Sequence, residues 1–236
     1  ENRKMSYYEH CRYRNFEGVV IVCANFDDPD VIELMNSEIP VVTIDYVHHN
    51  CTAVTSNNIQ GMEDLVKYIY SQGHRKIAYI HGQEGSSVTR DRLASFYRTI
   101  DELGLEIPDT YVRSADYLET KGSAKQTKEL LNLEDPPTCI IYPDDTSLIG
   151  GRNVIIEMGL RIPRDISVAG YDGTMISQLL YPKLTTIRQN TEMIGSEAAT
   201  RLIGTIEKPR TTLVERVVIE GILIPGQSVG KIPEQK

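Results

Sequence analysis

The chain has 236 residues, with 25 Lys and Arg against 33 Asp and Glu, so its formal net charge is −8. A composition of 40% hydrophobic and 25% charged residues is ordinary for a globular protein of one or two domains. The longest apolar run, residues 19–24, is far shorter than the roughly 20 residues that a membrane-spanning helix needs. An acidic chain without a basic stripe is also a poor binder of nucleic acid, because phosphate contacts need clustered Lys and Arg.

The four cysteines indicate neither a zinc site nor a disulfide framework. Cys11, Cys23, Cys51 and Cys139 are irregularly spaced, and no CxxC or Cys/His cluster occurs. Cys23 and Cys139 lie in apolar runs, where a free Cys behaves as a small hydrophobic side chain, so we expect both to be structural. Free thiols favour a reducing compartment, which predicts a cytoplasmic protein. We expect no metal ion and no other cofactor.

Short β-branched runs alternate along the chain with amphipathic segments of helical length. The runs predict strands at residues 18–23, 40–44, 76–80, 138–142 and 165–169, each nearly all apolar, as in parallel strands covered on both faces. The amphipathic segments predict helices at residues 3–14, 28–36, 59–71, 88–103, 145–158 and 191–206. Residues 211–224 are expected to be extended with a break near Gly221, and residues 225–236 to form a loosely held tail. The alternation predicts a doubly wound α/β architecture.

No recognised catalytic motif accompanies this pattern. The sequence contains no GxSxG, HExxH or GxxxxGK[ST] segment, and none of its five histidines lies beside an obvious nucleophile. Asp144 and Asp145 follow an apolar strand, where they could bind a metal or transfer protons. They could equally form a strand-to-helix turn, with Asp145 favoured at the start of the helix. We therefore expect a binding protein and not an enzyme.

Polar residues gather at the predicted strand ends, which is where open α/β sheets bind ligands. These positions hold Asp45, Tyr46, residues 81–83, Asp144, Asp145, Tyr171 and Asp172, and Arg90 and Arg92 follow one of them. Carboxylates, arginine forks and tyrosine rings suit a polyhydroxylated or heteroaromatic small molecule. The alternatives are that Arg92 pairs on the surface with Asp91 or Glu102, that the tyrosines only pack in the core, and that Asp172 is a cap.

Five segments, in order along the chain, resemble signatures of the lactose/galactose repressor (LacI/GalR) family of bacterial transcription factors. They are residues 73–80 (GHRKIAYI), 92–96 (RLASF), 143–150 (PDDTSLIG), 159–172 (GLRIPRDISVAGYD) and 182–189 (PKLTTIRQ). Gly195, Ala198 and Leu202 follow in register. Each segment is weak by itself, but the ordered series covers nearly the whole chain.

The resemblance implies a periplasmic-binding-protein-like fold, with two doubly wound parallel-sheet lobes and a ligand cleft between them. The N-terminal lobe would comprise residues 1–57 and 190–214, the C-terminal lobe residues 58–189 and 215–228, and residues 229–236 would be a tail. The implied function is effector sensing in a transcriptional regulator, where lobe closure on a sugar or sugar derivative, or less favourably a purine, changes operator affinity. DNA would be bound by an N-terminal headpiece absent from this chain, and a homodimer is implied.

The ligand-binding residues expected from the resemblance and the strand ends are Asp45, Tyr46, Arg92, Asp144, Tyr171 and Asp172. Three positions depart from the family pattern: Asn57 replaces a frequent Asp, Ser95 the usual Gly and Asp144 the usual Asn. The exchange at position 144 removes an amide donor and adds a charge, which predicts a ligand with more donors, or a cation. The competing class is an extracytoplasmic sugar-binding protein of a transport system, against which the four unpaired cysteines argue.

Overall fold

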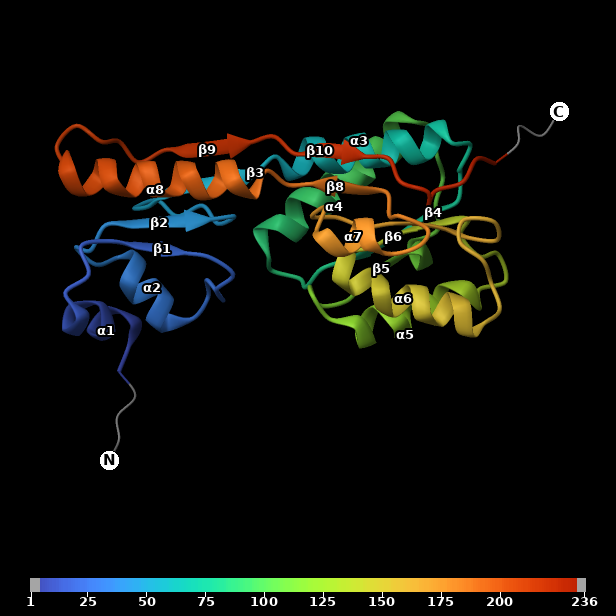
Figure 1. Cartoon of the computed structure of the whole chain (residues 1–236), viewed down its shortest axis with the longest axis horizontal. Helices are drawn as coiled ribbons and strands as arrows, with labels where there is room; N and C mark the ends of the chain where they lie inside the picture. The colour runs from blue at the N-terminus through green and yellow to red at the C-terminus, as the bar shows by residue number, and fades with distance from the viewer. Residues whose placement is uncertain (1–4, 233–236) are drawn as a thin grey trace. The chain divides into compact units, whose positions relative to one another are not determined.

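The structure is a computed structural model that describes residues 5–232 (Figure 1). Its backbone contacts divide the chain into two compact units, each made of two stretches of sequence. Unit 1 consists of Glu1–Asn57 and Asn190–Glu220, and unit 2 consists of Asn58–Gln189 and Gly221–Lys236. Within the described residues, no helix is both long and apolar enough to cross a membrane.

Unit 1 is built on a parallel sheet with the strand order β1-β2-β3-β9. Its elements are α1 (Tyr7–Arg14), β1 (Val19–Ile21), α2 (Pro29–Met35), β2 (Val41–Ile44), β3 (Thr52–Ser56), α8 (Thr191–Glu207) and β9 (Arg216–Ile219). Met35 of α2 packs in the buried cluster that holds Val41, whereas Ala198 of α8 packs in the cluster that holds Val42. Because neighbouring residues of a strand point to opposite faces, helices cover both faces of this sheet.

Unit 2 repeats this plan with the strand order β5-β4-β6-β7, again all parallel. Its elements are α3 (Asn58–Ser71), β4 (Ile77–His81), α4 (Ser87–Glu102), the short 3-10 helix Asp109–Tyr111, β5 (Val112–Ser114), α5 (Thr120–Leu131), β6 (Cys139–Ile141), α6 (Asp145–Glu157), β7 (Ser167–Ala169), α7 (Met175–Leu179), β8 (Thr186–Arg188) and β10 (Ile222–Ile224). Phe96 of α4 packs with Tyr79 on one face, and Leu148 of α6 packs with Ala78 on the other. The two parallel sheets confirm the predicted α/β class.

The last crossing between the units differs from the expected one. The family resemblance implies a boundary between residues 214 and 215, whereas the backbone contacts divide the chain between Glu220 and Gly221. The cause is β9, which pairs in parallel with β3, with Val217 opposite Val54. This pairing keeps residues 216–219 in the sheet of unit 1. After the crossing, β10 pairs antiparallel with β8 in unit 2.

Helix α5 was not expected from the sequence, because its buried face is polar. The buried residues are Ser123, Thr127 and Leu130, so two of the three carry hydroxyl groups. Thr127 donates a hydrogen bond of 2.7 Å to the carbonyl oxygen of Ser123, and its hydroxyl lies 2.7 Å from that of Tyr142. The Thr127 hydroxyl is satisfied in this way and can be buried, whereas the buried Ser123 hydroxyl has no hydrogen-bond partner among the described residues. Buried hydroxyl-bearing residues leave no apolar stripe in the sequence.

The cysteines are free thiols in the structure, and one of them contradicts the expectation. Cys139 is buried within β6, as are Cys11 and Cys51 in unit 1, but Cys23 is exposed. Strand β1 ends at Ile21, and Cys23 adopts a φ of 53° in the turn that follows. The apolar run therefore continues beyond the strand, and its last part turns toward the surface.

The C-terminal segment is held more firmly than the expected loose tail, up to the last described residue. Ser228 is 0% exposed, and its hydroxyl donates a hydrogen bond of 2.7 Å to the carbonyl oxygen of Val168. The backbone N–H of Gly230 donates to Oγ of Ser167 at 3.0 Å. The remainder of the tail, residues 233–236, lies outside the described residues.

His74 fastens this segment to the sheet of unit 2. Its Nε2 donates to the carbonyl oxygen of Gly230 at 3.0 Å, and its Nδ1 lies 2.9 Å from Oγ1 of Thr138. The residue is 2% exposed, and burial lowers the pKa of its imidazole below the usual value. The neutral ring is therefore the form that the folded protein prefers.

The close approach of α6 to α5 gives a first prediction. A Cβ added at Gly150 would lie 1.9 Å from the carbonyl oxygen of Thr120, a backbone atom that cannot move aside alone. Gly150→Ala should therefore lower the free energy of unfolding of unit 2 by about 1–3 kcal/mol, measured by urea denaturation. The control is Gly195→Ala in α8, where the new Cβ meets no atom within 4 Å. It should stabilise unit 1 by about 0.5–1 kcal/mol, and equal effects of both exchanges would contradict the packing described here.

His74 gives a second prediction, on the dependence of stability on pH. Because the folded-state pKa of His74 lies below its unfolded value, the unfolded chain binds the proton more readily. The full contribution of the neutral ring to the free energy of unfolding is therefore present above the pKa that His74 has in the unfolded chain, and it decreases as the pH falls below that pKa toward the lower folded-state pKa. The free energy of unfolding of the wild type relative to His74→Gln should therefore be larger at pH 7.5 than at pH 5.5. A relative stability that is constant or grows toward pH 5.5 would contradict it.

Candidate functional site

A buried arginine of unit 2 lies at the centre of the candidate site. Arg92 is carried by α4 and is 2% exposed. Its Nε donates a hydrogen bond of 2.8 Å to Oδ1 of Asn58, and its Nη1 donates one of 2.9 Å to the carbonyl oxygen of Pro143. A buried guanidinium needs such partners because removing an unpaired charge from water is very costly. The start of α3 and the end of β6 are thereby joined through one side chain.

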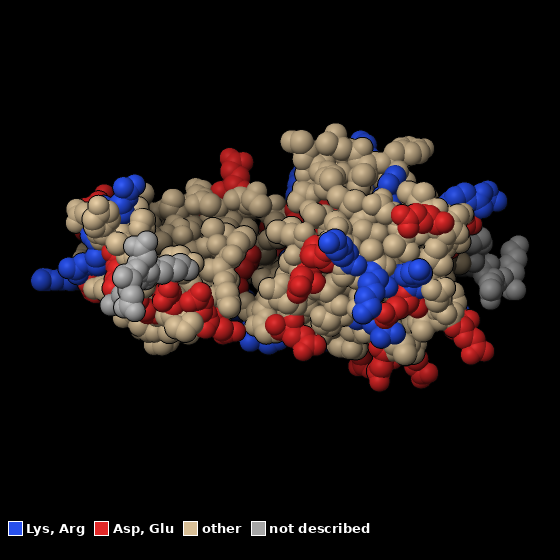
Figure 2. All heavy atoms as spheres, turned by 90° about the horizontal axis from the view of Figure 1, so that it is seen from below, with Lys and Arg blue, Asp and Glu red and all other residues tan. Residues whose placement is uncertain are grey.

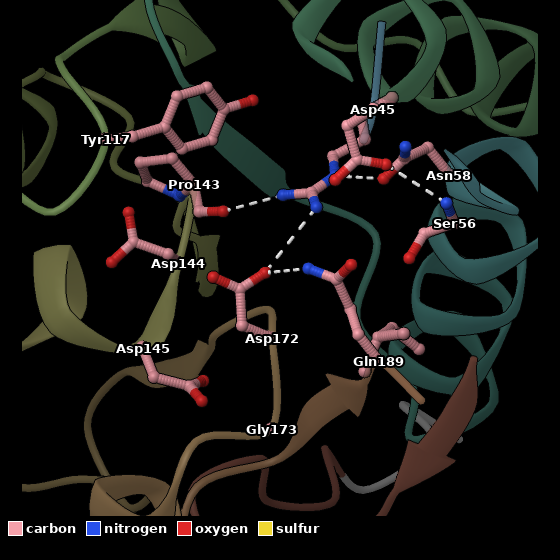
Figure 3. Close-up of polar contacts among 12 residues, drawn as sticks. Asp45, Ser56, Asn58, Tyr117, Pro143, Asp144, Asp145, Asp172, Gly173 and Gln189 are labelled. Atoms are coloured by element: carbon pink, nitrogen blue, oxygen red, sulfur yellow. Dashed lines mark hydrogen bonds and ion pairs between the residues drawn. The ribbon is translucent and has the colours of Figure 1, made fainter. Parts of the chain in front are cut away.

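Tyr171 and Asp172, directly after β7, complete the surroundings of this guanidinium. The Cζ atom of Arg92 lies 3.5 Å from the ring centroid of Tyr171, and Nη2 lies 3.6 Å from Oδ1 of Asp172. The Nε2 of Gln189 donates to the same carboxylate oxygen at 2.5 Å. In Figure 3, dashed lines from Pro143 and from Asp172 meet on one guanidinium, and another joins Asp172 to Gln189. Burial raises the pKa of Asp172, although the charge of Arg92 opposes that shift.

The backbone around Asp172 is held in an unusual conformation. Asp172 has a φ of 92° and Gly173 one of 63°, both in the left-handed region. A Cβ at Gly173 would lie 2.4 Å from Cα of Arg188, so no larger residue fits there. The N–H of Gln189 donates to the carbonyl oxygen of Asp172 at 3.2 Å. The end of β8 therefore fixes the direction of the Asp172 carboxylate.

The two neighbouring acids Asp144 and Asp145 differ in role. Asp145 is fully buried and accepts hydrogen bonds from the N–H and hydroxyl of Thr174, at 2.7 and 3.0 Å, and from the hydroxyl of Thr186, at 2.8 Å. Burial raises the pKa of Asp145 to about 6. The strand-to-helix turn considered from the sequence is formed, with Asp144 as the N-cap of α6 and Asp145 as the first residue of that helix. Among the described residues, no group of three or more His, Cys, Asp or Glu could hold a metal ion.

The ring of Tyr117, after β5, also lies near the guanidinium. Its centroid is 5.9 Å from Cζ of Arg92, and its hydroxyl is 2.9 Å from Oγ1 of Thr89. A Cβ at Gly82 would lie 2.1 Å from two atoms of this ring, so the ring packs directly over the Gly82 backbone. Tyr117 thus adds an aromatic surface, which Figure 3 shows on the same side as Pro143.

In unit 1, the expected residues Asp45 and Tyr46 follow β2. Asp45 has a φ of 59°, and its Oδ1 accepts a hydrogen bond of 3.1 Å from the N–H of Ser56. The ring of Tyr46 stacks on that of Phe26, with centroids 4.1 Å apart and planes at 2°. Phe26 follows β1, so this aromatic pair lies at the carboxyl ends of two adjacent strands of unit 1.

The structure brings Arg92, Tyr171 and Asp172 together at the carboxyl edge of the unit 2 sheet. The surface pairing considered for Arg92 is not formed: Arg90 lies beside Asp91, and Arg98 lies beside Glu102. Three further residues belong to the site that sequence reasoning did not select: Asn58, Tyr117 and Gln189. Gln189 ends one of the family-like segments and could have been found there. Tyr117 lies in a stretch without clear periodicity, so the sequence offers no signal for it.

The fold agrees with the comparisons with known proteins. The family described as "Periplasmic binding protein-like domain" matches residues 66–229. The chain is similar to the crystal structure of a LacI transcriptional regulator from Bacillus cereus subsp. cytotoxis, with a TM-score of 0.88 and 25% identity, covering 96% of this chain and 80% of that one. It is also similar to the transcriptional regulator CelR in complex with cellobiose, with a TM-score of 0.83 and 25% identity, covering 94% and 71% of the two chains.

Curated relatives give the same picture over part of their length. The probable HTH-type transcriptional repressor ExuR of Bacillus subtilis is 28% identical over 86% of this chain and 62% of its own. The HTH-type transcriptional repressor PurR of Aliivibrio salmonicida is 26% identical over 87% of this chain and 62% of its own. The chain thus spans about 62% of the length of these relatives. It belongs to the periplasmic binding protein-like domain family, as an effector-binding domain of the LacI regulator type.

Proposed function

We propose that this domain senses a small neutral sugar or sugar derivative as part of a DNA-binding transcriptional regulator. The observation that carries the proposal is the buried Arg92 with the Asp172 carboxylate beside it, at the carboxyl edge of the unit 2 sheet. A guanidinium donates to hydroxyl oxygens and a carboxylate accepts from hydroxyl protons, so the pair matches vicinal sugar hydroxyls. The CelR relative, solved with cellobiose, supports a sugar as the class of effector.

The charges around this cluster favour a neutral ligand over an anionic one. Asp144, Asp145 and Asp172 lie near the site, and Arg92 is the cation that faces Asp172. The guanidinium already donates to Asn58 and Pro143, so its charge is largely compensated within the protein. A phosphate or carboxylate ligand would add a negative charge beside carboxylates, which is unfavourable in a partly buried site.

A purine is the second candidate, supported by the similarity to PurR. A base would need a free aromatic face on which to stack. The Tyr171 ring is already covered on one side by the Arg92 guanidinium at 3.5 Å, which leaves Tyr117 as the aromatic group of unit 2 for this role. A sugar binds mainly through its hydroxyls, which the Arg92–Asp172 pair can contact, and it does not require a second aromatic ring. The arrangement therefore favours a sugar over a purine.

Coupling to DNA forms the other half of the proposal. On the face that Figure 2 shows, the described Lys and Arg are interspersed with Asp and Glu, and they form no continuous basic stripe. We assign DNA binding to a headpiece outside this sequence, because the relatives are named HTH-type transcriptional repressors. Closure of the lobes on the effector, with Asp45 and Tyr46 contributing from unit 1, would change operator affinity. A transcriptional regulator acts on DNA, so we propose the cytoplasm as the compartment of this protein. The alternative function is that of a sugar-binding protein of a transport system.

The effector proposal predicts a selective response in a ligand screen. In a thermal-shift screen of neutral sugars, sugar phosphates, uronates and nucleobases, stabilisation of this chain should be confined to neutral sugars. A ligand at 100 times its dissociation constant adds about 2.7 kcal/mol, enough to shift the midpoint by a few degrees. Stabilisation by nucleobases alone would replace the sugar with a purine effector, and stabilisation by uronates or phosphates alone would contradict the charge argument.

Variants locate the binding of any sugar hit. Asp172→Asn and Arg92→Ala should each weaken its binding by about tenfold or more in calorimetry, because a hydrogen bond to a charged group is lost. Arg90→Ala is the matched control, since Arg90 lies on the same helix with a side chain that is 77% exposed. Unchanged affinity in both site variants would remove the effector from this cluster.

A homodimer is the assembly that we propose for the regulator. Helix α7 and the residues after it expose Met175, Leu179 and Tyr181 by 79%, 75% and 83%, an unusual group of apolar side chains on a surface. A second copy of the chain would cover them. Leu179→Glu should then shift the sedimentation coefficient from dimer to monomer without altering the circular dichroism spectrum, whereas Ile203→Glu, at an exposed residue of α8, should not. A wild-type monomer at micromolar concentration would contradict the proposal.

A further inference from the structure

Asp144 is almost completely enclosed by hydrogen-bond donors of its own unit. Its Oδ1 accepts a bond of 2.8 Å from the N–H of Ser147, which caps α6. Its Oδ2 accepts bonds of 2.7 Å from the hydroxyl of Ser147 and of 2.9 Å from the N–H of Leu118. The residue is 1% exposed. Both carboxylate oxygens are therefore committed to the protein.

This arrangement gives a reason for the carboxylate at a position where the family resemblance has Asn. Two backbone N–H groups, of Ser147 and of Leu118, point at opposite oxygens of the side chain. An amide has one oxygen and one NH₂ group, so it could accept from one of these N–H groups and would present a donor to the other. Only an acid group accepts on both sides.

The segment held in this way carries Tyr117. Leu118 has a φ of 58°, a left-handed conformation that costs an L residue about 1–2 kcal/mol and persists only where contacts maintain it. Its side chain is 64% exposed, so it contributes little packing to hold the turn. The bond from the Leu118 N–H to Asp144, at 2.9 Å, is shorter than the two other polar contacts of this segment. These are the bond of 3.5 Å from the N–H of Tyr117 to Oε1 of Gln83 and the bond of 3.4 Å from the hydroxyl of Ser147 to the carbonyl oxygen of Asp116.

We propose that Asp144 is a positioning residue and not a ligand contact: by holding the Leu118 amide, it keeps the Tyr117 ring fixed beside Arg92. The ring then offers a rigid flat surface for the apolar face of a sugar ring, while the Arg92–Asp172 pair takes hydroxyls. On this proposal the charge at position 144 serves the Leu118 amide, and it does not select a ligand rich in donors. The inference rests on the proposed function only where it assigns the ring to the effector.

The test measures amide hydrogen exchange by NMR in the ligand-free chain. Asn and Ser are both good N-cap residues, so Asp144→Asn and Asp144→Ser should keep the Ser147 amide protected. Neither side chain can serve both amides, so the Leu118 amide should exchange about tenfold faster or more, because its charged acceptor is lost. Ser147→Ala is the control: it removes a hydroxyl from Oδ2 but leaves the Leu118 bond, and Leu118 should stay protected.

A second measurement follows the ring itself. The chain contains no tryptophan, so Tyr117→Trp gives a single fluorophore at this position. Combined with Asp144→Asn, its emission should move to longer wavelength and be quenched more efficiently by acrylamide than with Asp144 intact.

Leu118 exchange that is unchanged in both variants would overturn the inference, because position 144 would then be a helix cap alone. An equal rise at Ser147 would also overturn it, because the variants would then have loosened the whole start of α6. Since no ligand is present, these outcomes are independent of the effector screen. If no sugar stabilises the chain but the Leu118 amide exchanges faster in the Asp144 variants, the sugar proposal is rejected and the positioning role of Asp144 stands.

Discussion

The buried guanidinium of Arg92 is the constraint on which the site of unit 2 depends. A charge removed from water must find partners, and here they come from segments that are far apart in the sequence. Asn58 and Pro143 lie 34 and 51 residues from Arg92, and Asp172 follows strand β7. One side chain therefore ties together α3, the end of β6 and the end of β7. These contacts hold the carboxyl edge of the unit 2 sheet in place.

Around this guanidinium, three acids that look alike in the sequence serve three different purposes. Asp172 faces the guanidinium. Asp145 accepts hydrogen bonds from the hydroxyls of Thr174 and Thr186, and Asp144 accepts hydrogen bonds from two backbone N–H groups. Each acid is defined by its donors, and each donor set comes from a different loop. An exchange to the corresponding amide would therefore have a different consequence at each position, although the chemical change is the same.

The strands that could be predicted best are those that bury apolar side chains on both faces of the sheet. Strands β4 and β6 lie in the middle of the unit 2 sheet, and their sequences are apolar throughout except for His81 at the end of β4. Strand β3 is equally buried but contains Thr and Ser, and α5 buries hydroxyls, so neither produced a recognisable period. The last crossing could not be placed because β9, with its exposed Arg216, differs from the apolar pattern of a central strand.

The sequence by itself determined the α/β class, the family and the chemical types at the strand ends, because these follow from local periodicity and ordered motifs. It also selected Arg92, Tyr171 and Asp172, which contact one another in the structure. Only the tertiary structure decided which acid faces the guanidinium, that Asp144 is enclosed by donors, and that Tyr117 belongs to the site. The reason is physical: hydrogen-bond direction and burial depend on loops that meet in space, and no local pattern in the sequence records where those loops meet.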